Sequence, residues 1–318
     1  MSDFKDMPVL ITGAEGFIGS HLCTRLVKEG ARVSALVLPG ADLSRLSGIE
    51  ESLSIHPIDI REFDQVEELV AATRPQRIFH LAAITDVKRD WDSVSPVTAV
   101  NLGGTINLLR ALSKVEYEIC ITTCTAEAYG GNPAPFREEM PLDPISPYSF
   151  SKAAATAFCR MAAASLGASV RILRLFLVYG PGQGEERFLP QLIRAAITGS
   201  PFRMTAGEQT REYTYIDDLV EGFLLAAEKG PGKGEVYNLG SGREISLKDL
   251  VAIVGNIAGK KVIRDSNILP YRENEIRRFV GDHGKAAEEL DWRATTDLET
   301  GLKQTITSPY LCEGALSP

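Results

Sequence analysis

The stretch 9–22 constrains the fold of this chain more than any other part of its sequence. It opens with the apolar run 9–12, which is typical of a buried strand, and continues into apolar residues at helical spacing. Gly13, Gly16 and Gly19 stand between the two, three residues apart. Glycines let the backbone approach a phosphate closely, and the helix N-terminus behind them offers unpaired N–H groups and the positive end of its dipole. The stretch therefore predicts a dinucleotide-binding turn of the form G-x-x-G-x-x-G.

Strand-like runs alternate with helical segments through the first half of the chain. The expected strands are 9–12, 32–37, 53–57, 77–81, 118–123 and 169–176. The expected helices between them include 63–73, 95–112 and 148–167. This alternation predicts an α/β fold with a doubly wound parallel sheet of Rossmann type, in which ligands bind beyond the carboxyl ends of the strands.

The pattern changes after residue 182, where a smaller C-terminal lobe is expected to begin. The elements expected there are 187–198, 217–228, 235–239 and 247–258. We therefore predict a dinucleotide-binding domain over 1–180, to which 212–242 returns, and a lobe over 181–318 that mainly binds the substrate.

Composition and charge argue against several classes of protein. A net charge of −8 over 318 residues argues against a nucleic-acid or anionic-membrane partner. No apolar run reaches membrane length, and the first residues lack a signal-peptide pattern. The five cysteines and four histidines show neither metal-ligand spacing nor clustering. We expect a cytoplasmic enzyme with reduced cysteines and without a metal site.

The residues that follow the second and third expected strands bear on the cofactor. Val37 and Leu38 stand where an acid meets the adenosine ribose of NAD, or an arginine the 2′-phosphate of NADP. Because no cation is placed for a phosphate, we expect NAD and keep NADP as the alternative. Asp59 and Ile60 offer a carboxylate and a backbone N–H to the adenine. The alternative is that Asp59 only caps the helix that begins near Glu62.

The end of the fourth expected strand has small residues that leave room for the ribose and the diphosphate. These are Leu81, Ala82 and Ala83. His80, just before them, is expected to be a packed, hydrogen-bonded residue rather than a catalyst.

Tyr148 and Lys152 stand at positions i and i+4 of the helix expected after Pro147, and so share one face. A free tyrosine has a pKa of about 10 and is a poor base at neutral pH, and a nearby lysine cation is expected to lower that pKa. Thr125 follows the fifth strand, where its hydroxyl can donate to the substrate oxygen that Tyr148 deprotonates. The three side chains predict hydride transfer to a nicotinamide.

A series of motifs, in this order, resembles the extended short-chain dehydrogenase/reductase family, whose members include nucleotide-sugar epimerases and dehydratases. They are TGAEGFIG (12–19), HLAA (80–83), NLGGT (101–105), TAEAYG (125–130), YSFSK (148–152), RLFLVYGPG (174–182), TREYTYIDD (210–218) and YNLGSG (237–242). The resemblance runs from residue 9 to about residue 300 and so covers nearly the whole chain.

The resemblance implies roles for particular residues. It implies that Thr125, Tyr148 and Lys152 are catalytic and that Arg211 and Arg272 meet the diphosphate of a nucleotide sugar, a role that suits a guanidinium fork. The alternative for Arg211 is a surface ion pair with Glu208 or Glu212. The residues expected at the dinucleotide are Gly13, Gly16, Phe17, Ile18, Gly19, Asp59, Ile60, Leu81, Ala82, Ala83, Tyr148 and Lys152.

The resemblance also implies a homodimer. In similar proteins, the helices that correspond to 95–112 and 149–167 pair across a two-fold axis. The alternative is that the small and apolar residues of these helices only pack against the chain's own sheet.

The triplet 125–127 leaves the reaction open. A 4-epimerase needs only the three catalytic groups, NAD and room for the sugar to turn over. A 4,6-dehydratase also needs a base at C5, for which Glu127 is the candidate, and an acid at C6, but Ala126 stands where many dehydratases carry one. We therefore predict an epimerase or a dehydratase that oxidises C4 transiently, with Glu127 as a catalytic or substrate-binding residue. An NADPH-dependent 4-keto-sugar reductase is the alternative, and a non-catalytic dinucleotide-binding regulatory protein is the remote one.

Two further departures from the family concern the substrate. Leu177 stands where many members have an asparagine that contacts it, and Glu273 replaces the proline that usually follows the arginine at 272.

Overall fold

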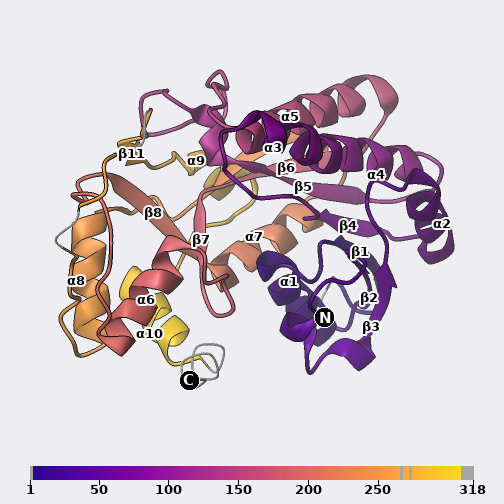
Figure 1. The fold of residues 1–318 in the computed structure, drawn as a ribbon. Helices are drawn as coiled ribbons and strands as arrows, with labels where there is room; N and C mark the ends of the chain where they lie inside the picture. Colours follow the sequence, from indigo (N-terminus) through magenta and orange to yellow (C-terminus); the bar gives the residue numbers. More distant parts are fainter. Residues whose placement is uncertain (1–2, 266–267, 272–273, 309–318) are drawn as a thin grey trace.

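The computed structural model describes residues 3–265, 268–271 and 274–308 (Figure 1). Its larger half is a seven-stranded, wholly parallel sheet in the order β3-β2-β1-β4-β5-β6-β9. The strands are β1 (Pro8–Thr12), β2 (Arg32–Val37), β3 (Leu53–Pro57), β4 (Arg77–His80), β5 (Ile119–Thr125), β6 (Val170–Leu175) and β9 (Lys233–Leu239). The strand order reverses at β1, which confirms the predicted doubly wound α/β fold.

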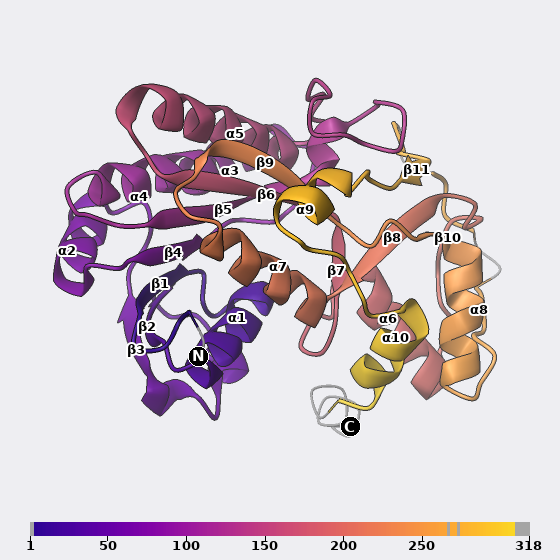
Figure 2. The same cartoon turned by 180° about the vertical axis from the view of Figure 1, so that it is seen from behind.

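Helices cover both faces of this sheet (Figure 2). On one face lie α2 (Phe63–Thr73), α4 (Gly104–Leu112) and α5 (Pro147–Leu166), and on the other α1 (Phe17–Lys28) and α7 (Ile216–Glu228). Each layer encloses its own apolar core. Because both faces are buried, the central strands are continuous apolar runs, and this is why the sequence marks them clearly.

The helix expected over 95–112 is divided in the structure. It begins earlier, as α3 (Trp91–Thr98), because Asp90 accepts a hydrogen bond from the Ser93 N–H at 2.8 Å and caps it. A π-helical turn (Ala99–Gly103) then joins α3 to α4. Such turns are frequent at functional sites. Here the turn directs Asn101 inward, where its amide nitrogen donates to the Ser151 hydroxyl at 2.9 Å.

The smaller half is built around a second sheet. In it, β8 (Thr210–Tyr215) pairs with β7 (Leu177–Tyr179), β10 (Glu244–Ser246) and β11 (Arg278–Phe279). The helices α6 (Phe188–Thr198), α8 (Leu247–Ile257), α9 (Gly284–Glu289) and α10 (Leu298–Ile306) follow in this part of the chain. After β8, the chain returns to the large sheet through α7 and β9. Among the described helices, none has the length and apolar character needed to cross a bilayer.

Candidate active site

The turn after β1 contains Gly13, Gly16 and Gly19, and we call it the glycine cradle. At Gly13 and Gly19 a side chain would clash with the neighbouring backbone. Gly13 has a φ of +69°, and a Cβ on it would lie 2.7 Å from the backbone nitrogen of Ala82. The turn therefore touches the 81–83 loop, which follows the neighbouring strand β4. Gly16 is the N-cap of α1 and makes no side-chain capping bond, so the end of the helix dipole faces the turn. This arrangement fits the pyrophosphate of a dinucleotide.

His80 has both ring nitrogens engaged inside the protein. One lies 2.7 Å from the Thr12 hydroxyl and the other 3.0 Å from the Thr105 hydroxyl. Burial, and in smaller part the charge of Lys152, lowers the pKa of His80 to about 3. The ring is therefore neutral at physiological pH, and the prediction that His80 is packed and hydrogen-bonded is confirmed.

Asp59 and Ile60 follow β3. The Asp59 carboxylate accepts a hydrogen bond from the Arg61 N–H at 2.9 Å and pairs with the Arg61 guanidinium, whose hydrogen bonds lower the Asp59 pKa. The N-cap of α2 is Glu62, without a side-chain capping bond, so the alternative that Asp59 caps this helix is wrong. Ile60 is buried, with its side chain against Gly104 of α4.

Thr125 and Tyr148 meet at the carboxyl end of β5. Thr125 is the last residue of that strand, and Tyr148 lies in the first turn of α5. The Thr125 side chain lies close enough to the Tyr148 hydroxyl to lower its pKa. Thr125 also accepts a hydrogen bond from the Glu127 N–H at 3.2 Å, which starts the short helical turn Ala126–Tyr129. Two hydroxyls thus lie together where a parallel sheet binds its ligand.

Burial raises the pKa of Tyr148, and the hydrogen bond to Thr125 and the charge of Arg187 lower it by smaller amounts. Lys152 is buried one turn further along α5, and its ammonium donates to the Thr123 hydroxyl at 3.1 Å. Burial lowers the pKa of Lys152 to about 8. The expected downward shift of the Tyr148 pKa by Lys152 is therefore not found: burial raises this pKa, and the groups that lower it are Thr125 and Arg187.

Glu127 lies near Tyr148, whose pKa its charge raises. The hydroxyl of Ser146 donates a hydrogen bond to the Glu127 carboxylate. Ser146 also caps α5 by accepting from the Ser149 N–H at 3.1 Å, so the same residue starts the helix and fixes the acid. Ala126 is fully buried and brings no polar group. Ser146 was not predicted as a site residue, although a serine before Pro147 at a helix start is a recognisable capping signal.

Arg211 lies in the second lobe, with its guanidinium held by its own chain. It donates to the Ile276 carbonyl at 2.8 Å and pairs with Glu275 at 2.5 Å. The alternative for Arg211, an ion pair with Glu208 or Glu212, is therefore wrong, because its partner is Glu275. The side chain still keeps about a sixth of its surface exposed (16%).

Other residues named from the sequence lie nearby or cannot be placed. Leu177 opens β7 and pairs with Tyr213 of β8. Arg272 and Glu273 lie outside the described residues.

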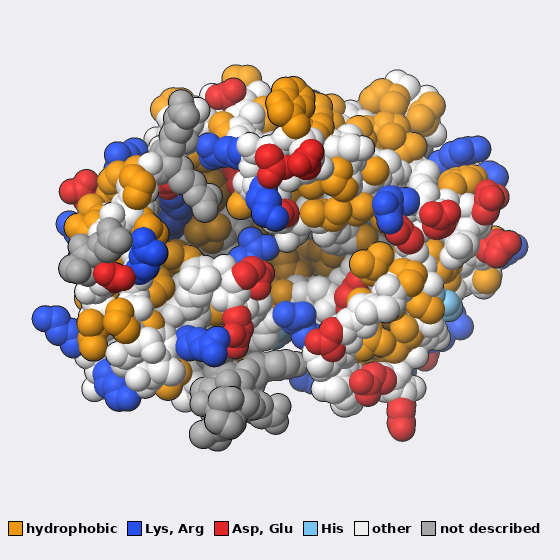
Figure 3. Space-filling model, viewed as in Figure 1, with side chains coloured by type: hydrophobic (Ala, Val, Ile, Leu, Met, Phe, Trp, Pro, Cys, Tyr) orange, Lys and Arg blue, Asp and Glu red, His pale blue; other side chains and the backbone are white. Residues whose placement is uncertain are grey.

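Arg187 is a residue that no sequence motif marked. It is the N-cap of α6, and its guanidinium donates to the Thr85 hydroxyl at 2.8 Å, which links the second lobe to the loop after β4. The surface is hollowed between the two lobes (Figure 3). A separate cavity of about 600 Å³ lies between α5 and β9 and does not include Tyr148.

Comparisons with known proteins show the family to which the chain belongs. A sequence model of the GDP-mannose 4,6 dehydratase family matches residues 10–305. A UDP-glucose 4-epimerase of Mycolicibacterium smegmatis is 34% identical over 317 residues, which cover 94% of this chain and 97% of the relative. A UDP-glucuronate 4-epimerase of Thermodesulfobacterium geofontis is 28% identical over 308 residues, covering 93% and 94%.

Solved structures are similar over almost the whole chain. The UDP-glucose 4-epimerase of Thermotoga maritima with UDP-glucose superposes with a TM-score of 0.87 at 30% identity and covers 97% of this chain and 99% of its own. The UDP-glucuronic acid 4-epimerase of Bacillus cereus, in complex with UDP-glucuronic acid and NAD, gives a TM-score of 0.87 at 29% identity and covers 96% and 99%.

Proposed function

This chain belongs to the GDP-mannose 4,6 dehydratase family, and on that premise we propose that it epimerises a nucleotide sugar at C4. It is an NAD-dependent nucleotide-sugar epimerase or dehydratase, since its relatives include UDP-sugar 4-epimerases and an enzyme with UDP-glucose 4,6-dehydratase activity. The cofactor is NAD, as in the Bacillus cereus complex. The comparisons fit the prediction of an epimerase or dehydratase. They do not fit the alternatives, a 4-keto-sugar reductase and a non-catalytic regulatory protein.

One observation carries the proposal: the side chains of Thr125 and Tyr148 lie close together, and the buried Lys152 follows one turn later on α5. Tyr148 exchanges a proton with the C4 oxygen of the sugar, and Thr125 donates a hydrogen bond to the same oxygen. NAD in the glycine cradle supplies the hydride acceptor and donor. An epimerase must return both proton and hydride after the sugar turns over, so one reversible acid–base group is sufficient.

The residue after Thr125 favours epimerisation. Dehydration requires an acid for the departing C6 hydroxyl in addition to a base at C5. Ala126 has a methyl group at this position and is fully buried. The described polar groups next to Tyr148 therefore suffice for proton exchange at C4, and position 126 supplies no acid for C6.

A 4,6-dehydratase is the second candidate, and two observations favour it. The matching family is described by that reaction. Glu127 lies close enough to Tyr148 for its charge to raise the Tyr148 pKa, and it is fixed there by Ser146. Glu127 would then be the C5 base. The variant Glu127→Gln would abolish dehydration and leave epimerisation within about tenfold of the wild type, the effect of one lost hydrogen bond.

The substrate is proposed to be a nucleotide-diphosphate sugar, held through its diphosphate by Arg211 and Arg272. The relatives include a UDP-glucose 4-epimerase and a UDP-glucuronate 4-epimerase. The guanidinium of Arg211 is fixed by Glu275 and Ile276, which supports the role because a preorganised fork loses little freedom on binding.

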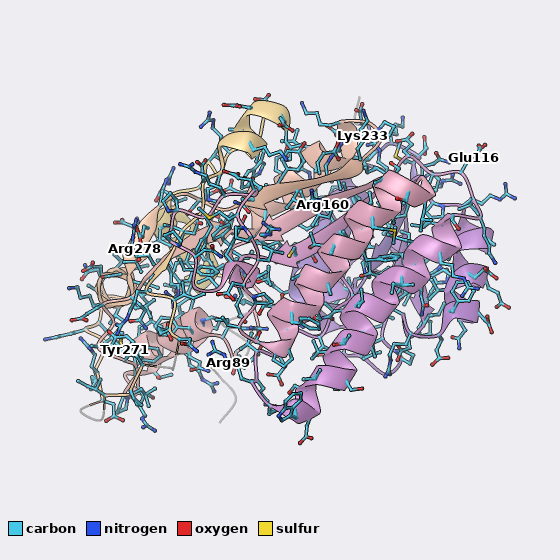
Figure 4. All side chains as sticks on the ribbon, turned by 90° about the horizontal axis from the view of Figure 1, so that it is seen from above. Arg89, Glu116, Arg160, Lys233, Tyr271 and Arg278 are labelled. Carbon is cyan, nitrogen blue, oxygen red and sulfur yellow. The ribbon has the colours of Figure 1, made fainter. Side chains whose placement is uncertain are left out.

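The assembly is proposed to be a homodimer that pairs through α3 and α5. These helices run along one face of the molecule (Figure 4). Large apolar side chains lie exposed on them: Trp91, Phe150, Met161 and Leu166. A run of exposed apolar side chains of this kind is typical of an interface.

Incubation with a panel of nucleotide sugars, followed by chromatography and mass spectrometry, tests the proposed reaction. A 4-epimerase gives a product of unchanged mass and altered retention, without added NADPH. A product lighter by one water would show that the enzyme is a dehydratase rather than an epimerase. Turnover only of a 4-keto sugar with NADPH would reject both.

A further inference from the structure

An acid reaches the end of β2 from an unexpected part of the chain. Dinucleotide-binding sheets usually carry there the acid that meets the adenosine ribose. In this chain Val37 is buried, and Leu38 is apolar and 53% exposed. Glu15, in the glycine turn after β1, fills the gap, since its Oε1 accepts a hydrogen bond from the Leu38 N–H at 2.9 Å.

The pairing of β1 with β2 explains why Glu15 lies there. The two strands are parallel neighbours, in register at Thr12 and Leu36, so the turn after β1 lies beside the end of β2 (Figure 1). The N–H groups of Gly13 and Ala14 both donate to the Leu36 carbonyl, at 2.9 and 3.3 Å. Glu15 follows directly, and its position is therefore set by the sheet.

The Glu15 carboxylate has acceptor capacity that the described part of the chain does not use. Its Oε2 is buried and receives no hydrogen bond from the described residues. A buried carboxylate oxygen without a donor is costly unless a partner supplies one. The other oxygen, Oε1, lies at the surface and accepts only the Leu38 N–H among the described residues, so its second lone pair can accept a hydrogen bond from a hydroxyl of a bound ligand.

The other charged residues after β2 are engaged elsewhere. Asp42 is the first acid after this strand, and it accepts hydrogen bonds from the Ser44 N–H and hydroxyl, both at 2.9 Å. Arg45 donates its Nε to the Gly182 carbonyl at 2.9 Å. Glu15 is thus the acid bonded to the end of β2 in this part of the structure.

We propose that Glu15 is the residue that selects NAD over NADP. Its carboxylate accepts a hydrogen bond from the 2′-hydroxyl of the adenosine ribose and repels a 2′-phosphate by like charge. The inference rests on the proposed function, because it requires a dinucleotide in the glycine cradle. It assigns to the turn after β1 a task that other dinucleotide sheets give to the end of β2.

Calorimetric titration of NAD and NADP tests this assignment without turnover. Glu15→Gln keeps the size and an oxygen for the Leu38 N–H but removes the charge. The wild type is expected to bind NAD at least about tenfold tighter than NADP, and Glu15→Gln to lose about tenfold of that preference, as for a hydrogen bond to a charged group. Glu15→Asp keeps the charge and is expected to keep the preference, and Asp42→Asn is the matched control and is expected to leave it unchanged.

Other outcomes overturn the proposal. A Glu15→Gln variant with wild-type preference, or an Asp42→Asn variant that loses it, would assign the role elsewhere. A wild type that prefers NADP would also refute it. If a correctly folded wild type, judged by its thermal transition, bound neither dinucleotide, the proposed function would fail together with this inference.

Discussion

At the scale of single residues, burial sets the protonation of the groups around the proposed substrate position. It raises the pKa of Tyr148, lowers that of Lys152 to about 8 and lowers that of His80 to about 3. At neutral pH the histidine is therefore neutral, and the lysine carries most of its charge. The polar chemistry of the site is concentrated in Tyr148, Thr125 and Lys152.

Replacing Tyr148 by phenylalanine removes the proposed acid–base group and keeps the ring. We expect kcat to fall by roughly 10²–10⁴, the usual contribution of general acid–base catalysis, with NAD affinity unchanged. Steady-state kinetics and calorimetry measure both. Tyr117→Phe is the control, because among the described residues the Tyr117 hydroxyl is bonded to the Ser169 N–H and to no residue of the site. Unchanged turnover by Tyr148→Phe would remove Tyr148 from the reaction.

The lowered pKa of Lys152 predicts how its replacement changes stability with pH. Because the folded pKa lies near 8 and the unfolded one near 10.4, the unfolded chain binds more protons between these values, and the wild type gains stability as pH rises through this window. Lys152→Met lacks this group and does not gain that stability. We therefore expect the free energy of unfolding of the wild type to rise, relative to that of Lys152→Met, by up to about 3 kcal/mol between pH 7 and pH 10.

Urea unfolding at several pH values measures this difference. Lys233→Met, at an exposed lysine, is the control and is expected to show no such trend. A stability difference between Lys152→Met and the wild type that is constant over this range would show that Lys152 is not held at a lowered pKa.

At the scale of elements, a buried ion pair joins the second sheet to the loops around it. Glu212 of β8 is fully buried and lies 3.0 Å from Nε2 of His283. It also accepts hydrogen bonds from the N–H groups of Gly281 and Gly242, at 2.7 and 2.6 Å. One carboxylate thus connects β8 with the loops that follow β9 and β11, directly beside Arg211.

Burial alone lowers the pKa of His283, but the hydrogen bond and charge of Glu212, the Asn238 carbonyl and the charge of Glu138 outweigh it, so the net pKa is raised. The stability that the pair contributes is therefore complete below the unfolded pKa and is lost as pH rises through the folded one. We expect His283→Gln to cost about 3 kcal/mol at pH 6, the cost of breaking a buried pair, and clearly less at pH 9.

Chemical denaturation at the two pH values checks this. His56, whose pKa burial lowers, provides the matched control. Its replacement by glutamine is not expected to produce a loss confined to acidic pH. A His283→Gln cost that does not change with pH would mean that the imidazole is neutral in the folded protein.

The sequence predicted most elements because their signals are local. The strand β1, whose last four residues are all buried, is marked by the apolar run that a doubly covered sheet requires. The divided helix was not foreseen, since its π-helical turn holds Asn101 in contact with Ile84 and with Ser151 of α5, both distant in sequence. Local patterns locate elements but not the register between them.

Only those residues of the candidate site that lie in sequence motifs were predicted. Thr125, Tyr148 and Lys152 lie in motifs and were named at once. Glu15 and Arg187 were not, because what distinguishes them is a neighbour distant in sequence, Leu38 for one and Thr85 for the other. Such contacts follow from the order of strands and lobes, which a single sequence does not state.

At the scale of the whole molecule, the proposed dimer buries the face formed by α3 and α5. Light scattering at micromolar concentration is expected to give twice the mass of one chain. Met161→Glu places a charge on this face, 44% exposed in the single chain, and is expected to give monomers. Ile263→Glu, on the second lobe, is the control. A monomeric wild type would refute the dimer.

The transient oxidation of C4 is the central claim, and a nucleotide sugar with deuterium at C4 tests it most directly. The account predicts that the label leaves C4 and returns to it within one active site. NMR of the product should therefore show the epimer with deuterium retained at C4, formed more slowly than from the unlabelled sugar. An epimer that has exchanged its label with water, or that forms at an unchanged rate with the C4–deuterium bond intact, would contradict the account.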